Sequence, residues 1–144
     1  MITYREMHID DYTHVIELWL NTESMRLRDA DSVESINRYL QHNPGLSFVA
    51  FDGDVLVGAV LVGTDGRRGY LQHLAVHTES RGQGVGKSLV DLSTAALERQ
   101  GVPKTHLFVL NENVSAQAFY ERLGWFVRDE VRMYSFNRSS NLNA

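Results

Sequence analysis

The residues best suited to chemistry form the run RGQGVGKS at positions 81–88. Its three alternating glycines let the main chain approach a ligand closely. The helix expected after them offers unpaired N–H groups and the positive end of its dipole to an anion. Arg81 and Lys87 flank the glycines with positive charge. We therefore predict a phosphate-binding loop here, the alternative being a tight turn that only joins a strand to a helix.

Two nucleotide-binding patterns nearly fit this loop. The Walker A pattern is completed at its end by Gly86-Lys87-Ser88, but Arg81 stands where its first glycine should be. The Rossmann pattern started at Gly82 would need Gly or Ala at position 87. Both patterns also belong to folds that begin with parallel strands, whereas the first half of this chain is predicted to be antiparallel. A P-loop-like nucleotide-binding phosphotransferase is therefore the alternative prediction.

A second segment of interest is NVSAQAFYERLGW at positions 113–125. Asn113 and Tyr120 are seven residues apart, which on a helix is close to two turns and places both on one face. That face can line a single groove. Asn113 is also a favourable helix N-cap, and Tyr120 is also suited to a core position beside Phe119.

The spacing of apolar residues and the turn signals predict the elements that position these segments. We expect an N-terminal strand, helices over 9–20 and 32–40, antiparallel strands over 46–51, 55–62 and 70–76, a helix that follows the glycines and stops at Gly101, a strand over 105–110, a helix over 113–123 and a closing strand over 126–136. This order predicts one α/β domain over residues 1–144, a mixed sheet with helices on its faces. The polar tail from Ser139 is expected to be frayed.

Composition excludes several classes of protein. The chain has 144 residues, 43% hydrophobic and 22% charged, as in a single globular domain. A net charge of -4 argues against nucleic acid or an anionic membrane as partner. Without cysteine, neither a disulfide nor a cysteine-bound acyl intermediate can form. The start has no signal-peptide pattern and no apolar stretch is long enough to span a bilayer, so we predict a cytoplasmic protein.

Three segments together resemble the GCN5-related N-acetyltransferase (GNAT) superfamily. Arg81, Gly84 and Gly86 match its acetyl-CoA loop, which has Arg or Gln, two residues, Gly, one residue, then Gly or Ala. Residues 74–76, at the end of the preceding strand, and residues 113–125 are similar to two further segments of the family. The predicted order of elements agrees as well, so the resemblance spans nearly the whole chain. It implies a GNAT-like fold: an N-terminal strand, two helices, a three-stranded antiparallel segment, then a βαβ-like half that binds acetyl-CoA.

The resemblance also implies an activity and a site. The chain would transfer the acetyl group of acetyl-CoA directly to a primary amine of a small molecule, amino acid or peptide, with a noncatalytic acyl-CoA sensor as a further alternative. Tyr120 would protonate the departing CoA thiolate, a role that suits a phenol with a reference pKa near 10. The residues expected to bind the cosubstrate are Leu74, Ala75, Val76, Arg81, Gly82, Gln83, Gly84, Val85, Gly86, Lys87 and Asn113. A homodimer is possible.

The group that takes the proton of the incoming amine is left open. Many family members place a Glu five residues before the hallmark Asn or an acidic residue early in the preceding strand, but these positions hold Phe108 and Tyr70 here. The remaining candidates are His73, Glu112, a water relay, or an amine that arrives neutral. His73 and His77 lie about 13 Å apart if four residues separate them along a strand, so we predict no metal site.

The loop between the first two helices is expected to border the acceptor. It carries charges of both signs: Glu23, Arg26, Arg28, Asp29 and Asp31. The carboxylates could place a cationic amine near the thioester, and an arginine could hold a substrate carboxylate. An amino-acid-like or short-peptide amine fits this mixture best. The alternative is that these are solvated loop charges.

Overall fold

The computed structural model describes residues 1–144, and at its centre lies one five-stranded sheet in the order β1-β2-β3-β4-β5. The strands are β1 (Ile2–Glu6), β2 (Phe48–Asp52), β3 (Val55–Thr64), β4 (Gly69–Val76) and β5 (Thr105–His106). The first four pair antiparallel in sequence order, and β5 pairs parallel to β4. This is the mixed sheet that the sequence predicts.

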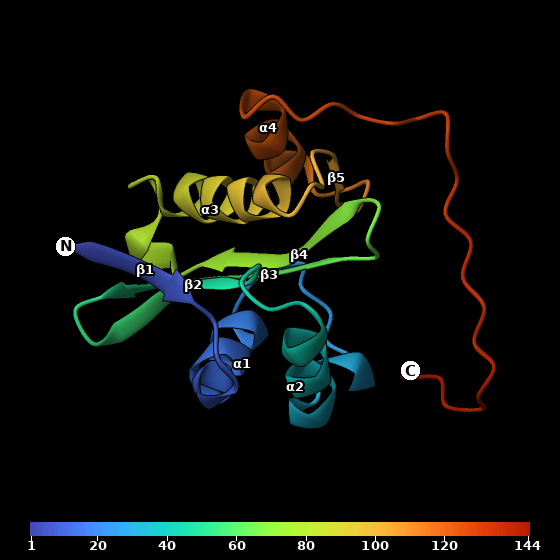
Figure 1. The fold of residues 1–144 in the computed structure, drawn as a ribbon, viewed down its shortest axis with the longest axis horizontal. Helices are drawn as coiled ribbons and strands as arrows, with labels where there is room; N and C mark the ends of the chain where they lie inside the picture. Colours follow the sequence, from blue (N-terminus) through green and yellow to red (C-terminus); the bar gives the residue numbers. More distant parts are fainter.

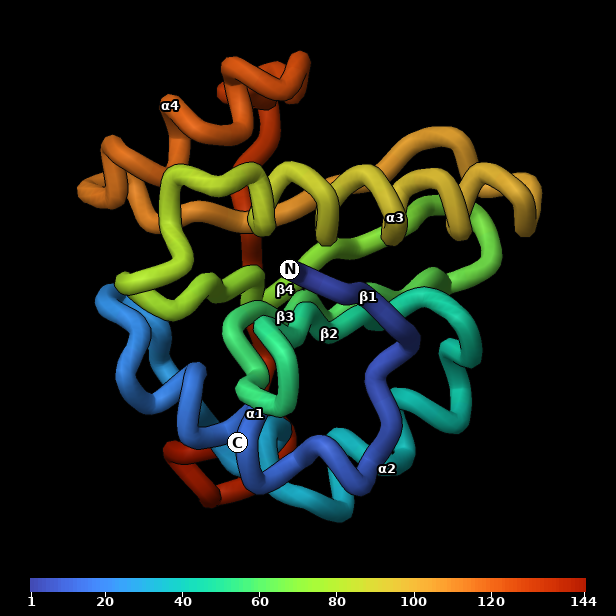
Figure 2. The backbone as a smooth tube through the Cα atoms, turned by 90° about the vertical axis from the view of Figure 1, so that its left-hand side faces the viewer, coloured from blue at the N-terminus to red at the C-terminus, as the bar shows by residue number.

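Helices cover both faces of the sheet. They are α1 (Tyr12–Leu20), α2 (Val33–His42), α3 (Val85–Arg99) and α4 (Val114–Arg122), with short 3-10 turns η1 (Ile9–Asp11), η2 (Asp29–Asp31) and η3 (Thr78–Ser80). Figure 1 shows α1 and α2 on one face and α3 and α4 on the other, and the side view in Figure 2 shows the same layers. None of the helices combines the length and the apolar composition that crossing a bilayer requires.

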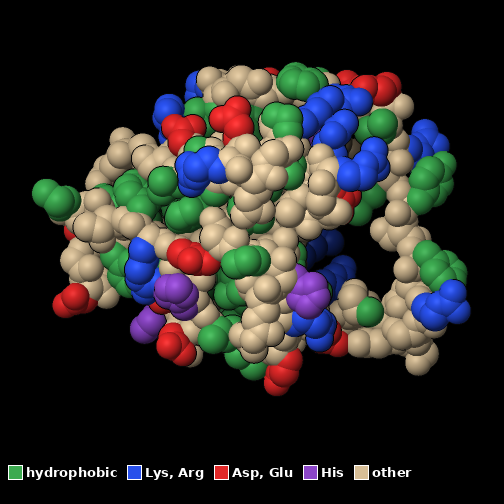
Figure 3. All heavy atoms as spheres, in the orientation of Figure 1, with side chains coloured by type: hydrophobic (Ala, Val, Ile, Leu, Met, Phe, Trp, Pro, Cys, Tyr) green, Lys and Arg blue, Asp and Glu red, His purple; other side chains and the backbone are tan.

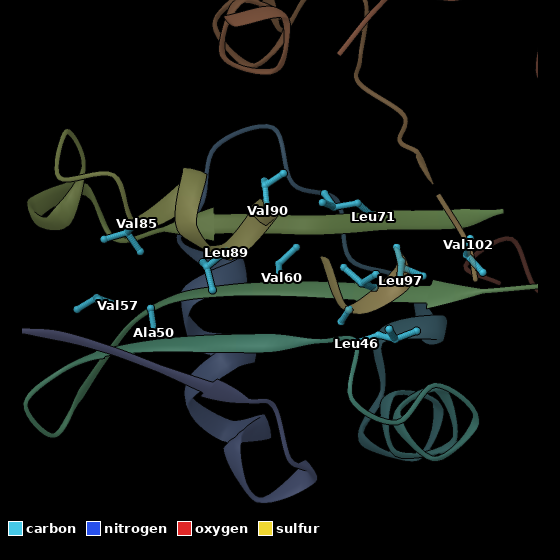
Figure 4. Packing of buried hydrophobic residues seen from close by; sticks show 12 residues of the cluster. Leu46, Ala50, Val57, Val60, Leu71, Val85, Leu89, Val90, Leu97 and Val102 are labelled. Atoms are coloured by element: carbon cyan, nitrogen blue, oxygen red, sulfur yellow. The ribbon is translucent and has the colours of Figure 1, made fainter. Parts of the chain in front are cut away.

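Strand β3 has a core on each side, because successive side chains of a strand point to opposite faces. On one face, the cluster against α3 includes Val60, Val62, Leu89 and Leu97 (Figure 4). On the other, the cluster against α1 and α2 includes Leu61, Val15, Trp19 and Ile36. Seven consecutive residues of β3 are buried, so its sequence has no alternation of polar and apolar side chains.

Strand β4 contains a bulge where it pairs with β3. Ala59 pairs with Ala75 and Leu61 with Gln72, so His73 and Leu74 together stand opposite one residue of β3. Beyond Tyr70, β4 has no partner on its other edge, since its pairing with β5 covers only Gly69 and Tyr70. The edge of β4 from residue 71 onward is therefore free of strand partners.

The chain after α4 departs from the prediction. The expected strand over 126–136 is wrong, and the strand expected over 105–110 extends only over Thr105–His106. Since β5 is so short, it offers no edge along which a following strand could pair, and apolar side chains such as Phe126 and Phe136 are exposed, at 69% and 85%. In the space-filling view this segment stands apart from the body of the molecule over most of its length (Figure 3).

The last residues, expected to be frayed, are exposed and make hydrogen bonds with Asp29. The side-chain amides of Asn141 and Asn143 each donate to the Asp29 carboxylate, over 2.6 Å. The Asp29 N–H donates in turn to the main-chain oxygen of Asn143, over 3.0 Å. The carboxyl terminus thus returns to η2, on the side of the sheet that carries α1 and α2 (Figure 1).

Candidate active site

A cleft of about 750 Å³ lies beside the free edge of β4. Its walls come from the end of β4, the glycine loop, the segment 107–110 and α4, with residues 22–26 at one side. All the residues that the sequence predicts for the site line this cleft, with the exception of Gln83. The structure therefore brings together three segments that the sequence shows only as separate motifs.

Two of the loop glycines are required by their backbone conformation. Gly82 and Gly84 have φ values of +80° and +79°, which side-chain-bearing residues rarely adopt. A Cβ atom on either would meet no atom within 4 Å, so the space in front of the loop is open. Gly84 is also the N-cap of α3, and the first N–H groups of that helix follow it directly. The loop thus presents main-chain donors to an open cleft.

Gly86 differs from these two glycines, because its backbone is not in the left-handed region and a ring lies close to it. A Cβ atom there would lie 3.2 Å from Cζ of Phe119, on α4. The missing side chain lets the Phe119 ring pack on the first turn of α3. This contact helps to hold α4, and with it Tyr120, against the glycine loop.

The two cations of the loop are engaged within the chain. Arg81 donates from Nε to the main-chain oxygen of Val76 over 3.0 Å, and its guanidinium lies 2.7 Å from the Glu23 carboxylate. Lys87 pairs with Asp91 one turn further along α3, over 2.6 Å, and both side chains are exposed. Arg81 therefore ties the loop to the end of β4. The geometry of Lys87 is that of a solvated residue at the start of a helix.

The end of β4 supplies a free main-chain donor. The His77 N–H donates to the Val57 oxygen over 2.7 Å, so it points toward β3. Adjacent N–H groups of a strand point to opposite edges. Val76 and Gly58 therefore form a non-hydrogen-bonded pair, and the Val76 N–H does not donate to β3. The Val76 N–H consequently faces the edge along which the cleft lies.

Asn113 and Tyr120 both line the cleft from α4. Asn113 Oδ1 accepts from the Ala116 N–H over 3.2 Å, which confirms that it is the N-cap of this helix. The Tyr120 ring packs edge-on against Phe119 and Trp125, with ring centroids 5.1 and 5.5 Å away. Its hydroxyl makes no hydrogen bond within the chain, and burial raises the pKa of Tyr120 well above its usual value. The hydroxyl is thus a protonated donor without a partner.

The candidates for the proton acceptor are placed very differently. His73 lines the cleft, whereas Glu112 is exposed and does not. Of the charged residues between α1 and α2, Glu23 and Arg26 line the cleft, while the others named from the sequence do not. Sequence reasoning missed the partners of these groups: Glu23 pairs with Arg81, and His73 with a carboxylate in η2. No local pattern in the sequence signals either contact.

Comparisons with known proteins identify the family of the chain. The family model described as "Acetyltransferase (GNAT) family" matches residues 6–125. The chain is 37% identical over 124 residues to Acetyltransferase ECA0875 of Pectobacterium atrosepticum, covering 86% of this chain and 87% of that relative. It is also 34% identical over 122 residues to Acetyltransferase SG1711 of Sodalis glossinidius, covering 85% of each.

Solved structures share the fold at lower sequence identity. The PaiA N-acetyltransferase from Thermoplasma acidophilum in complex with coenzyme A aligns with a TM-score of 0.78 and 20% identity, over 90% of this chain and 92% of that one. Naa50 of Arabidopsis thaliana, in complex with the bisubstrate analogue CoA-Ac-MVNAL, aligns with a TM-score of 0.72 and 20% identity, over 89% and 85%. The chain therefore belongs to the GNAT family of acetyltransferases and is an acyltransferase whose cosubstrate is acetyl-CoA.

Proposed function

We propose that this enzyme transfers the acetyl group of acetyl-CoA directly to a primary amine of a small molecule, an amino acid or a peptide. The observation that carries this proposal is the convergence of the β4 edge, the glycine loop and Tyr120 on one cleft. The chain has no cysteine to hold an acyl group, which favours direct transfer. The solved Naa50 complex contains a peptide-bearing analogue, which supports an amine of that kind as a candidate acceptor.

The residues of the cleft fit the cosubstrate. The N–H groups that follow Gly82 and Gly84 would bind the pyrophosphate, as the start of a helix does. The unpaired edge of β4 at residues 74–76 would bind the pantetheine amides in the manner of an added strand. Asn113, at the start of α4, would hydrogen-bond to the cosubstrate. Acetyl-CoA supplies the reactive thioester, and the chain supplies groups that orient it.

Two groups of this chain would act on the reacting atoms. The Val76 N–H would donate to the carbonyl oxygen, where negative charge develops. The Tyr120 hydroxyl would give its proton to the sulfur as the carbon–sulfur bond breaks. Burial favours the neutral phenol, so the proton is in place at neutral pH.

The alternatives drawn from the sequence gain no support. A P-loop follows a strand of a parallel sheet, whereas β4 runs antiparallel to β3 and parallel only to the two residues of β5. The other alternative, a noncatalytic sensor, differs from the proposed enzyme in that it would bind CoA without turnover. The cytoplasmic location and the homodimer stay predictions of the sequence.

One experiment separates acetyl transfer from the sensor function. The protein is incubated with acetyl-CoA and a panel of L-amino acids, short peptides with a free amino terminus, and diamines, and release of free thiol is followed. Amine-dependent release is expected for at least one class. Release that is absent with every amine, in a protein that is stabilised by CoA, would instead assign the sensor function.

A further inference from the structure

We propose that His73 takes the proton of the acceptor amine and that Asp31 is a positioning residue that orients its imidazole. This inference rests on the proposed acetyl transfer and names the group that the sequence leaves open. Three independent features carry it: the backbone of His73, the contacts of Asp31, and the place of the pair between two cavities.

His73 has an unusual backbone. Its φ is +51°, in the left-handed region, and it occupies the bulge of β4. A non-glycine residue persists in that region only when its surroundings hold it, and such residues cluster at functional sites. The ring is held on one side by Trp19, with ring centroids 4.8 Å apart, and on the other by a hydrogen bond to Asp31. The bulge thus aims one particular side chain out of the regular pattern of the strand.

Asp31 is itself fixed by three contacts. Its Oδ1 lies 2.9 Å from His73 Nε2, its Oδ2 accepts from the Arg28 N–H over 3.0 Å, and its main-chain oxygen accepts from the Tyr12 hydroxyl over 2.6 Å. Burial favours the neutral acid, but the hydrogen bonds from His73 and from the Arg28 N–H outweigh it, so the pKa of Asp31 is lowered. Asp31 is therefore an ionised acceptor in a defined position.

This contact determines which ring nitrogen of His73 is available. A carboxylate can only accept, so Nε2 carries the ring proton of the neutral imidazole. Nδ1 then has a free lone pair, and it makes no hydrogen bond within the chain. Nδ1 is the atom that can take a proton.

The pair lies where two cavities approach each other. His73 lines the large cleft, Asp31 lines a second cavity of about 510 Å³ next to α2, and Gln72 lines both. Acetyl-CoA would lie along the edge of β4, so this second cavity offers the amine a separate approach. The charged or titratable side chains that line the cleft with His73 are Glu23, Arg26, Arg81, Lys87, Tyr120 and Arg122, and those that line the second cavity with Asp31 are Arg38, Tyr39 and His42. Tyr12 and Arg28 contact Asp31 directly.

Every bond and proton is accounted for in the proposed transfer. The amine nitrogen bonds to the carbonyl carbon and gives a proton to His73 Nδ1, while the carbon–sulfur bond breaks and the sulfur takes the proton of the Tyr120 hydroxyl. The products are the acetylated amine and CoA with a free thiol. His73 then loses its extra proton to solvent, and Tyr120 regains one from solvent.

The test uses the intact protein and the amine of the panel that gives the fastest thiol release. His73→Gln keeps a side-chain amide that can donate to Asp31 but cannot take a proton, so kcat should fall by about 10²-fold or more. Asp31→Asn should lower kcat by a smaller factor. The stabilisation of each variant by CoA should equal that of the wild type. His14→Gln and Asp10→Asn, which alter exposed residues outside both cavities, should leave kcat unchanged.

Chemical rescue separates proton transfer from a structural role. Glycine suits the positive φ of position 73, so His73→Gly should fold and leave room for added imidazole. We expect imidazole to restore kcat in this variant but not in Tyr120→Phe, after subtraction of the thiol released by imidazole without amine. Wild-type kcat in His73→Gln, or a folded His73→Gly that imidazole does not rescue, would overturn the inference. Failure of the proposed function is distinct, because the wild type itself would then release no thiol.

Discussion

A Cβ atom on Gly86 would lie 3.2 Å from Cζ of Phe119, so the Phe119 ring of α4 occupies the space beside the first turn of α3 that a side chain at position 86 would need. Replacing a glycine by alanine within a helix normally increases the free energy of unfolding, by about 1 kcal/mol. At position 86 the added methyl group meets an aromatic ring, and overpacking costs roughly 1–3 kcal/mol.

We therefore predict that Gly86→Ala destabilises the wild type but stabilises the Phe119→Ala background. Denaturant unfolding of the four proteins of this double-mutant cycle measures the effect. The same sign of change in both backgrounds would show that the ring does not crowd this position.

CoA should stabilise the fold, whereas Mg-ATP should not. At about 100 times its dissociation constant, the expected gain is roughly 2.7 kcal/mol. Gly84→Val puts a side chain into the open space of the loop at a φ of +79°, and should abolish the gain while the protein still folds. Gly101→Val is the matched control, since Gly101 has a φ of +87°, equally open surroundings and a place outside the cleft. Thermal unfolding with and without CoA distinguishes them, and equal CoA stabilisation in both variants would contradict the loop assignment.

Tyr120→Phe removes one proton donor and keeps the contacts of the ring with Phe119 and Trp125. Steady-state kinetics should show kcat reduced by about 10² to 10⁴, with little change in the KM for acetyl-CoA. Tyr134→Phe, an exposed position outside the cleft, should have no effect. Unchanged turnover in Tyr120→Phe would leave Tyr120 a packing residue only.

The charged residues between α1 and α2 should differ in their effect on the acceptor. Arg26 lines the cleft, whereas Arg28 does not. If the active amine carries a carboxylate, Arg26→Glu should raise its KM, because the new charge repels it, and Arg28→Glu should not. Equal KM values for both variants and the wild type would show that this loop does not recognise the acceptor.

The free energy of unfolding should decrease at acid pH, in part because Asp11 becomes protonated. Burial acts to raise the pKa of its carboxyl group, but hydrogen bonds from Arg5 and the His8 N–H outweigh burial and lower it. A group whose pKa is lower in the folded state contributes stability above its unfolded pKa, about 4, and loses it as pH falls through the folded pKa. Urea unfolding between neutral pH and about pH 3 should therefore show a smaller acid loss in Asp11→Asn than in the wild type. Parallel curves for the two proteins would exclude this contribution.

The parts of the site that sequence predicts are those specified locally. Gly82 and Gly84 are needed by the backbone of one turn, and Asn113 caps the helix that begins beside it, so each leaves a signal in a short stretch of sequence. The antiparallel strands β2, β3 and β4 likewise follow from apolar runs separated by turns. These features required no knowledge of distant parts of the chain.

Other features depend on contacts between distant segments. His73 and Asp31 are 42 residues apart, and the bulge that aims His73 is an interruption of the strand pattern rather than a part of it. The apolar residues over 126–136 predict a strand, but pairing needs an available edge, and β5 provides only two residues. The hydrogen bonds of Asn141 and Asn143 with Asp29 join segments over 100 residues apart.

Acetyl transfer to an amine in this cleft is tested most directly by one reaction with acetyl-CoA and the amine panel. Both the free thiol and the acetylated amine are measured in it, the amine by mass spectrometry. We predict that the two products form in equal amounts and that both decline together in Tyr120→Phe. Thiol released without any acetylated amine, or no thiol above the rate without protein, would contradict the account.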